Sequence, residues 1–193
     1  MNQKKRLALL VLLTSEMQKR GSWCGETHIQ KATFLLQELL NVNVGFEFIL
    51  YRHGPFSFDL RDELLNMRAD DLLELAIKRE GYGPAYFPTD FSAAFLLKFP
   101  KTVARFKAQV RFIAEELKDK RVTDLEKLAT LYFIKDRERM DDAAKIVERL
   151  VDLKPHISHS EAWDAIHELD GLQKRAKPFI LDQSDDWFEF QAS

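Results

Sequence analysis

The sequence predicts an α+β protein that is mostly α: a winged-helix-like N-terminal half with a small antiparallel sheet, followed by an all-helical C-terminal half. Three observations support this prediction. The first 90 residues have the order helix, helix, strand, helix, strand, turn, strand, which is the element order of a winged helix. Every patterned stretch after residue 90 has a helical period. With 193 residues, 46% of them hydrophobic, the chain can bury a sizeable core. We expect a winged-helix-like domain over residues 1–90 and a helical domain over residues 91–193.

The first helix begins with a segment that resembles a signal peptide. Basic residues 4–6 precede seven apolar residues, 7–13. Charged Glu16 and Lys19 follow closely, no small-x-small cleavage site is present, and seven apolar residues are too few to span a bilayer. We therefore expect the first helix of a cytoplasmic protein that contacts no membrane. The single cysteine, Cys24, is consistent with a reducing compartment.

Three helix starts share one motif. In a capping box, a hydroxyl side chain and a Glu or Gln three residues later satisfy the exposed backbone N–H groups of a helix start. The motif occurs at residues 27–30 (T-H-I-Q), 123–126 (T-D-L-E) and 158–161 (S-H-S-E), each before an apolar pattern of helical period. The helical stretches expected in the C-terminal half are 91–99, 101–118, 123–135, 139–154 and 158–177.

An alternating, aromatic-rich stretch, residues 45–52, predicts a strand between the second and third helices. The Gly54-Pro55 pair ends this strand and forms the corner into the third helix, for which Ser57 is the expected N-cap. Acidic residues follow in or near the first turn, where negative charge complements the helix dipole. Residues 72–79 and 85–88 then predict two strands joined by a Gly-rich turn.

The third helix is a poor recognition helix for DNA. Such helices present Arg, Lys, Asn or Gln to the bases and need nearby positive charge for the phosphates. Four acids and only two arginines occupy the expected outward positions: Asp59, Asp62, Glu63, Asp70, Arg61 and Arg68. The whole chain carries a net charge of −2, so no global field attracts a polyanion. The sequence therefore disfavours insertion of this helix into a groove.

The helix after Pro100 is the best candidate for a basic surface. Its apolar positions fall on one face and its basic positions on the other, with Phe112 exposed among the basic ones. No acid interrupts residues 91–114. The candidate basic surface consists of Lys101, Arg105, Lys107 and Arg111. Such a face suits an acidic protein segment or a nucleic-acid backbone, and a solvated helix face is the alternative.

The catalytic candidates are weak. Cys24 and His28 offer a nucleophile and a base, but no third group is evident that would orient them. Two acid-x-Lys pairs, at 116–118 and 152–154, lie on predicted helices without the partner acid of a metal nuclease. Three histidines lack the acid-flanked spacing of a metalloprotease helix: His156, His159 and His167. We expect no catalytic residue, no metal and no cofactor, and therefore no enzyme.

The end of the first strand supplies the candidate partner-binding residues. Tyr51, Arg52 and His53 precede the Gly-Pro corner, where a strand end points side chains into a shallow groove. Together with Arg61 of the next helix, they would accept an extended peptide or a small anion. In the alternative interpretation Tyr51 packs inside, and Arg52 pairs with Glu63 or another acid of the third helix.

The last stretch, residues 182–190, contains four acids, three aromatics and no Lys or Arg. Two interpretations stay open for it. It is either a terminal strand docked on the protein's own core or an acidic-aromatic tail for a partner.

Residues 28–37 (H-I-Q-K-A-T-F-L-L-Q), a strand ending in Y-R-H-G-P-F-S at 51–57 and an amphipathic helix follow one another in this chain. This order resembles a small family of bacterial and archaeal proteins without assigned activity. It is similar, more distantly, to the Panacea (SocA-like) antitoxin domain, in which a Lys-Leu-x-Lys-Leu-like helix precedes an aromatic strand and a Gly-Pro corner. The resemblance covers roughly residues 5–90, with 122–129 as weaker support. It implies a domain that binds and neutralises toxin proteins, although Y-R-H at 51–53 replaces the more usual acidic-aromatic run.

The sequence therefore predicts a non-enzymatic protein-interaction module, which would act as a regulator or as an antitoxin-like partner. A winged-helix DNA-binding transcriptional regulator is the alternative. We expect a protein partner, while nucleic acid and a homodimer stay open as partners.

Overall fold

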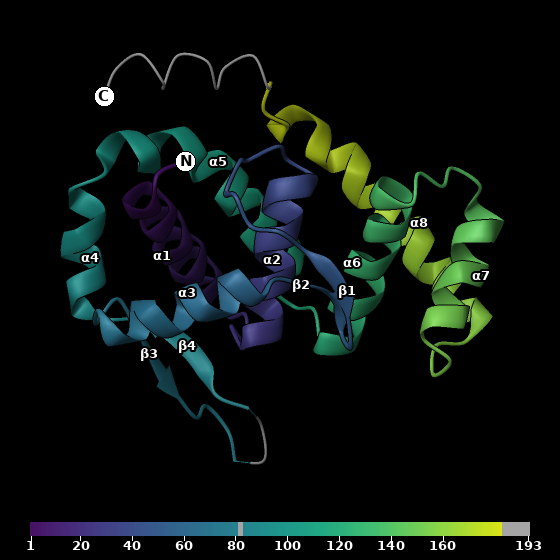
Figure 1. Ribbon diagram of the computed structural model, residues 1–193, viewed down its shortest axis with the longest axis horizontal. Coiled ribbons are helices and arrows are strands. Elements are labelled where there is room, and N and C mark those ends of the chain that lie inside the picture. Colours follow the sequence, from purple (N-terminus) through teal and green to yellow (C-terminus); the bar gives the residue numbers. More distant parts are fainter. Residues whose placement is uncertain (81–82, 183–193) are drawn as a thin grey trace.

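The computed structural model describes residues 1–80 and 83–182, and it confirms the mostly helical α+β class (Figure 1). The helices of the N-terminal half are α1 (Gln3–Lys19), α2 (Glu26–Glu38) and α3 (Phe58–Ala69). The strands are β1 (Ile49–Tyr51), β2 (Gly54–Phe56), β3 (Leu73–Ala76) and β4 (Ala85–Pro88). The remaining helices are α4 (Asp90–Leu97), α5 (Pro100–Leu117), α6 (Val122–Arg137), α7 (Ala143–Leu153) and α8 (His159–Ala176), followed by the 3-10 turn η1 (Lys177–Phe179).

Residues before and after residue 90 contribute to one hydrophobic core. α1 packs along α5, and α2 contacts both α5 and α6 (Figure 1). The apolar run 9–13 of α1 is buried on every side of the helix. A helix that is apolar all round belongs in the centre of a domain, which accounts for the signal-peptide-like composition of this segment. Within the described residues no helix is long and apolar enough to cross a membrane.

The strands form two separate antiparallel hairpins. β3 pairs with β4 from Leu73 opposite Pro88 to Ala76 opposite Ala85, as the sequence predicts for the wing. β1 pairs with β2, so that Gly54 and Pro55 lie in a return strand; the prediction that they form the corner directly after the first strand is wrong.

The first strand is also shorter than the predicted stretch 45–52. The side chain of Gln37 binds the backbone there: it accepts from the N–H groups of Gly45 and Phe46 and donates to the carbonyl oxygen of Phe46. These groups are therefore satisfied without a partner strand.

The predicted helix starts are confirmed where the cap is purely local. Ser57 accepts from the N–H of Leu60, and Ser158 forms the predicted capping box with Glu161. The capping boxes predicted at residues 27–30 and 123–126 are wrong. α2 and α6 begin at Glu26 and Val122, and their N-caps, Gly25 and Arg121, lie two residues before the predicted Thr27 and Thr123. The two acceptors of the predicted boxes, Gln30 and Glu126, make tertiary contacts instead.

The five helical stretches predicted after residue 90 are all present, with α7 starting later than predicted, at Ala143. Asp142 caps α7 by accepting from the N–H groups of Ala144 and Lys145. The acidic-aromatic stretch 182–190 lies outside the described residues, apart from Asp182.

Candidate protein-interaction surface

Two side chains of α2 bind the backbone of residues 55–57, at the end of the β1–β2 hairpin and on the side that we call its rear. The Gln30 amide donates to the carbonyl oxygen of Ser57 (2.9 Å) and accepts from its N–H (2.9 Å). The ammonium group of Lys31 donates to the carbonyl oxygen of Pro55 (2.8 Å). Both side chains are fully buried. Gln30 and Lys31 of the H-I-Q-K motif therefore satisfy backbone groups of Pro55 and Ser57.

A buried charge cluster completes this rear side. Glu126 of α6 and Lys154, the residue after α7, form an ion pair at 2.7 Å, and both are buried. Lys154 also donates to the carbonyl oxygen of Arg52, and Nδ1 of His53 lies 3.4 Å from the carboxylate of Glu126. Burial lowers the pKa of Lys31 to about 8, against the opposing effect of the Glu126 charge. Burial alone would raise the pKa of Glu126, but the hydrogen bonds and charges of Lys154 and His53 lower it below its usual value.

Gly54 fits this rear side because it has no side chain. Its φ is +81°, in the left-handed region that favours glycine. A Cβ at this position would lie 2.6 Å from Oγ1 of Thr130 and 3.4 Å from the carbonyl oxygen of Glu126. The hairpin turn is therefore pressed against α6, and the rear contacts fix its place in the fold.

The opposite face of the hairpin exposes aromatic rings. Tyr51, Phe56 and Phe58 form a cluster with centroid distances of 5.7, 5.5 and 5.1 Å. Tyr51 is 45% exposed, Phe58 39% and the neighbouring Ile49 44%. The guanidinium group of Arg61 lies 5.1 Å from the centroid of the Phe58 ring. Contiguous exposed apolar side chains, with aromatic residues and arginine among them, are typical of protein contact sites.

This patch continues along α3. Side chains three, four and three residues apart share one face of the helix: Phe58, Arg61, Leu65 and Arg68. Leu65 is 48% exposed. Glu63, predicted to point outward, is buried instead and pairs with Arg6 at 3.6 Å. The alternative pairing of Arg52 with Glu63 is therefore wrong. We refer to Ile49, Tyr51, Phe56, Phe58, Arg61, Leu65 and Arg68 as the front surface.

The front surface ends at a pocket of about 800 Å³. The pocket lies between the N-terminus of α2, the C-terminal part of α3, the β3–β4 hairpin and the loop from α5 to α6. Its apolar lining comes from Trp23, Leu65, Leu75, Pro84, Tyr86 and Val122. Its charged lining residues are Glu26, Arg68, Lys118, Asp119, Lys120 and Arg121. This volume and this mixture of apolar walls with a few polar groups are typical of ligand-binding pockets.

The charged residues that line the pocket have both signs, with Glu26 and Asp119 beside four cations. Three of the four cations pair with acids: Lys118 with Glu115, Lys120 with Glu168, and Arg121 with Asp124. Arg68 forms no ion pair within the part of the chain that the structure describes. α2 starts at the pocket with Gly25 as its N-cap, and no side chain caps it. Glu26 lies in the first turn of α2, where its negative charge complements the positive end of the helix dipole, so Arg68 is the cation that stays available to a ligand.

The predicted partner-binding residues divide between the two faces of the hairpin. Tyr51 and Arg61 meet at Phe58 on the front surface. The backbone of Arg52 and the ring of His53 engage the buried charge cluster at the rear. Sequence reasoning missed Phe58, Leu65 and Arg68 as members of the surface. The sequence contained one signal for this: Phe58 and Leu65 are apolar residues on the face of α3 opposite its buried side.

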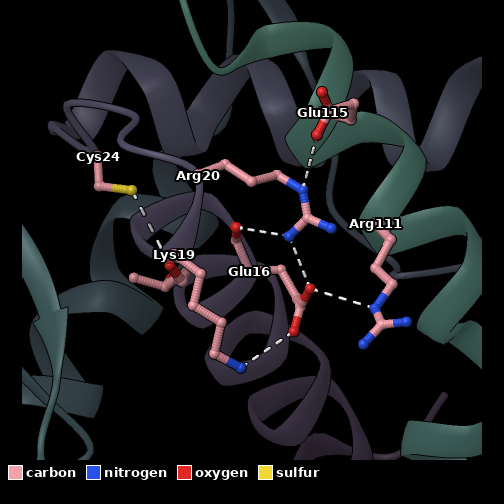
Figure 2. A network of polar contacts seen from close by, with 7 residues as sticks. Glu16, Lys19, Arg20, Cys24, Arg111 and Glu115 are labelled. Carbon is pink, nitrogen blue, oxygen red and sulfur yellow. Dashed lines mark hydrogen bonds and ion pairs between the residues drawn. The ribbon is translucent and has the colours of Figure 1, made fainter.

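The predicted basic surface is only partly present. Arg111 pairs with the buried carboxylate of Glu16 at 3.3 Å, together with Lys19 and Arg20 (Figure 2). Phe112, predicted to be exposed, is buried and stacks on Phe179 at 4.6 Å between ring centroids. Lys101 and Lys107 are exposed, and Arg105 lies 5.4 Å from the ring of Phe106. The positive charge of α5 is therefore concentrated in its N-terminal part.

Cys24 and His28, the two side chains considered as a catalytic pair, are both buried. Cys24 is buried, its thiol lies 3.9 Å from the carbonyl oxygen of Thr14, and burial raises the pKa of the thiol to about 11. His28 is buried, which lowers its pKa against the opposing effect of the Lys120 backbone. Among residues 1–80 and 83–182, no group of three or more His, Cys, Asp or Glu residues could hold a metal ion.

Comparison with known proteins adds no relative: no protein-family model and no curated protein matches this chain.

Proposed function

We propose that this chain is a non-enzymatic protein-interaction module, a regulator or an antitoxin-like partner, and that it binds its partner through the front surface. One observation carries the proposal: Tyr51, Phe58 and Leu65 are 39–48% exposed on a hairpin and helix whose rear is held by buried polar contacts. Large side chains that are already held in place lose little conformational entropy when they bind. The resemblance to an antitoxin domain favours the same class of partner.

The pocket supports a partner segment that carries an apolar side chain beside a carboxylate. The apolar walls suit an aromatic or branched anchor, and the guanidinium group of Arg68 favours a negative charge next to it. Anchors that fill pockets dominate the energetics of protein interfaces. The partner segment would therefore lie along α3 and end in the pocket.

The distribution of charge favours a protein partner over DNA. Asp59, Asp62 and Asp70 are exposed on α3 and would repel phosphates. Arg61 already pairs with Asp62 at 2.8 Å. The DNA-binding alternative therefore has less support than the protein-binding proposal.

The test is site-specific photo-cross-linking in the native host. A photoreactive amino acid at position 65 is expected to cross-link one defined protein, whereas the same amino acid at Trp163, a 39% exposed aromatic on α8, is not. The double variant Tyr51→Ala with Phe58→Ala is expected to lower the affinity for that protein about tenfold or more, because truncated anchors cost about 1–4 kcal/mol each. Trp163→Ala serves as the matched control.

Circular dichroism and thermal unfolding establish that the variants remain folded. Equal cross-linking at positions 65 and 163, or equal binding by the double variant and by Trp163→Ala, would exclude the front surface as the binding site. If the protein bound duplex DNA at low salt and the variant Arg61→Glu did not, the DNA-binding alternative would be favoured instead.

A further inference from the structure

A second exposed apolar surface lies at α4, which packs against α1, α5 and β4. α4 buries only Ser92, and it leaves Phe91 45% exposed and Leu97 81% exposed. The following helix starts with exposed Lys101. The surface therefore combines apolar side chains with positive charge, and no acid occurs between residues 91 and 114.

One side of α5 connects this surface to the end of the described chain. Four residues with spacings of four, four and three share this side of the helix: Lys101, Arg105, Gln109 and Phe112. At its C-terminal end, Gln109 donates to the carbonyl oxygen of Phe179 (3.1 Å), and Phe112 stacks on the Phe179 ring. Lys101 and Arg105 continue the same side toward α4.

The last described residues are tied down close to this point. The N–H of Leu181 donates to the carbonyl oxygen of Leu40, and the amide of Asn41 donates to the carbonyl oxygen of Leu181. Figure 1 shows the described chain ending close to the C-terminal end of α2. Residue 182 therefore starts beside α5 rather than at a distant part of the molecule.

The remaining sequence, D182-Q-S-D-D-W-F-E-F-Q-A-S193, has the complementary composition. It carries four acids and three aromatics and no Lys or Arg: Asp182, Asp185, Asp186, Glu189, Trp187, Phe188 and Phe190. Lys101 is about 12 Å from Gln109 along the helix, at about 1.5 Å per residue. An extended chain covers about 3.3 Å per residue, so that Trp187 reaches up to about 17 Å beyond Asp182. The remaining segment is therefore long enough to span from Gln109 past Lys101 to α4.

We propose that residues 182–193 dock in cis on α4 and on the Lys101–Arg105 side of α5. The carboxylates of Asp185 and Asp186 contact these two cations, and the aromatic rings cover Phe91 and Leu97. Attachment to the same chain gives such a short segment an effective concentration of the order of mM, so that modest contacts suffice to hold it. This contact uses a different surface from the one proposed for the partner protein.

Tryptophan fluorescence of the full-length chain tests the proposal. With Trp23→Phe and Trp163→Phe, Trp187 is the remaining tryptophan. We expect blue-shifted emission that is independent of protein concentration and protected from acrylamide. Lys101→Glu with Arg105→Glu is expected to raise the acrylamide quenching constant about threefold or more, and high salt to act in the same direction.

Lys107→Glu is the matched control, because Lys107 is an exposed cation of the same helix that lies away from this side. As a second measurement, a photoreactive amino acid at position 188, with all three tryptophans retained, is expected to cross-link to residues 91–97 of the same chain. Docking in cis would be overturned if Trp187 were fully quenchable in the parent or if Lys107→Glu had an equal effect. Cross-links found only between two copies would also overturn it. Binding of phosphatidylserine vesicles by a chain whose Trp187 is already fully quenchable without them would also overturn it, by assigning the surface to lipid.

Discussion

The β1–β2 hairpin has two faces with opposite chemistry. At the rear, Lys31 and Glu126 are buried, and the turn at Gly54 packs against α6 without space for a methyl group. On the front, Tyr51 and Phe58 keep 39–45% of their surface exposed and contact mainly one another. The two faces of one short hairpin therefore differ in role: contacts at the rear fix its position in the fold, and the front is the surface proposed for the partner.

The buried charges at the rear fix the position of the hairpin, because each charge needs its partner in one particular place. An ion pair such as that of Glu126 and Lys154 adds little net stability relative to apolar residues, but losing one partner leaves the other charge buried and unpaired. The hairpin therefore has one favourable position. The front has no such constraint, since its side chains are partly solvated.

The largest expected effect comes from breaking the rear charge cluster. Glu126→Gln leaves Lys31 and Lys154 buried without a counter-charge, and we expect it to lower the free energy of unfolding by about 3–5 kcal/mol. Phe58→Ala, on the front, is expected to cost about 1 kcal/mol. Urea unfolding monitored by circular dichroism measures both. Glu148→Ala, at an exposed acid of α7, is the control, and equal losses for Glu126→Gln and Phe58→Ala would contradict the separation of the two faces.

A comparison of alanine substitutions at two glycines measures the energetic effect of the contact between the hairpin turn and α6. Gly54 and Gly21 both have φ of +81°, but a Cβ at Gly21 would meet no atom within 4 Å. We expect Gly21→Ala to cost about 1 kcal/mol for the backbone conformation and Gly54→Ala about 2–4 kcal/mol, because its methyl group also collides with Thr130. Thermal unfolding measures both variants. Thr130→Ala in the Gly54→Ala background should recover part of the difference, and no recovery would contradict the close contact.

The smallest expected effect is a dependence of stability on pH. The pKa of Lys31 is about 8 in the folded chain, against an ordinary value of 10.5, so between these two pH values the unfolded chain binds more protons. Stability contributed by this group therefore rises with pH, by about 2 kcal/mol between pH 7 and 9.5. Subtracting the pH profile of Lys31→Met from that of the parent isolates this gain. A flat difference would show that Lys31 keeps its ordinary pKa.

Local sequence signals were sufficient where a structure depends on neighbours in the chain. The caps at Ser57 and Ser158 are confirmed, since their partners lie three residues away. The same type of signal failed at Thr27 and Thr123. There the expected acceptors, Gln30 and Glu126, bind the backbone of Ser57 and the ammonium group of Lys154, which are distant in sequence.

The candidate surface was predictable in part for the same reason. Tyr51 and Arg61 were predicted as partner-binding residues, and the structure brings them together at Phe58. Periodicity did not show that Phe112 would be covered by Phe179, because the covering residue is 67 positions away. It did not show that Arg111 would be neutralised by Glu16 either.

The amino-acid pattern was sufficient to predict the helical content, the order of the helices and the place of the β3–β4 hairpin, because hydrophobic period and turn residues act over a few positions. It did not predict β2 or its pairing with β1. Tertiary structure alone decided which polar side chains are buried, which aromatics stay exposed and where the pocket forms. These properties depend on which distant segments meet, and a polar group is buried only where a distant partner satisfies it.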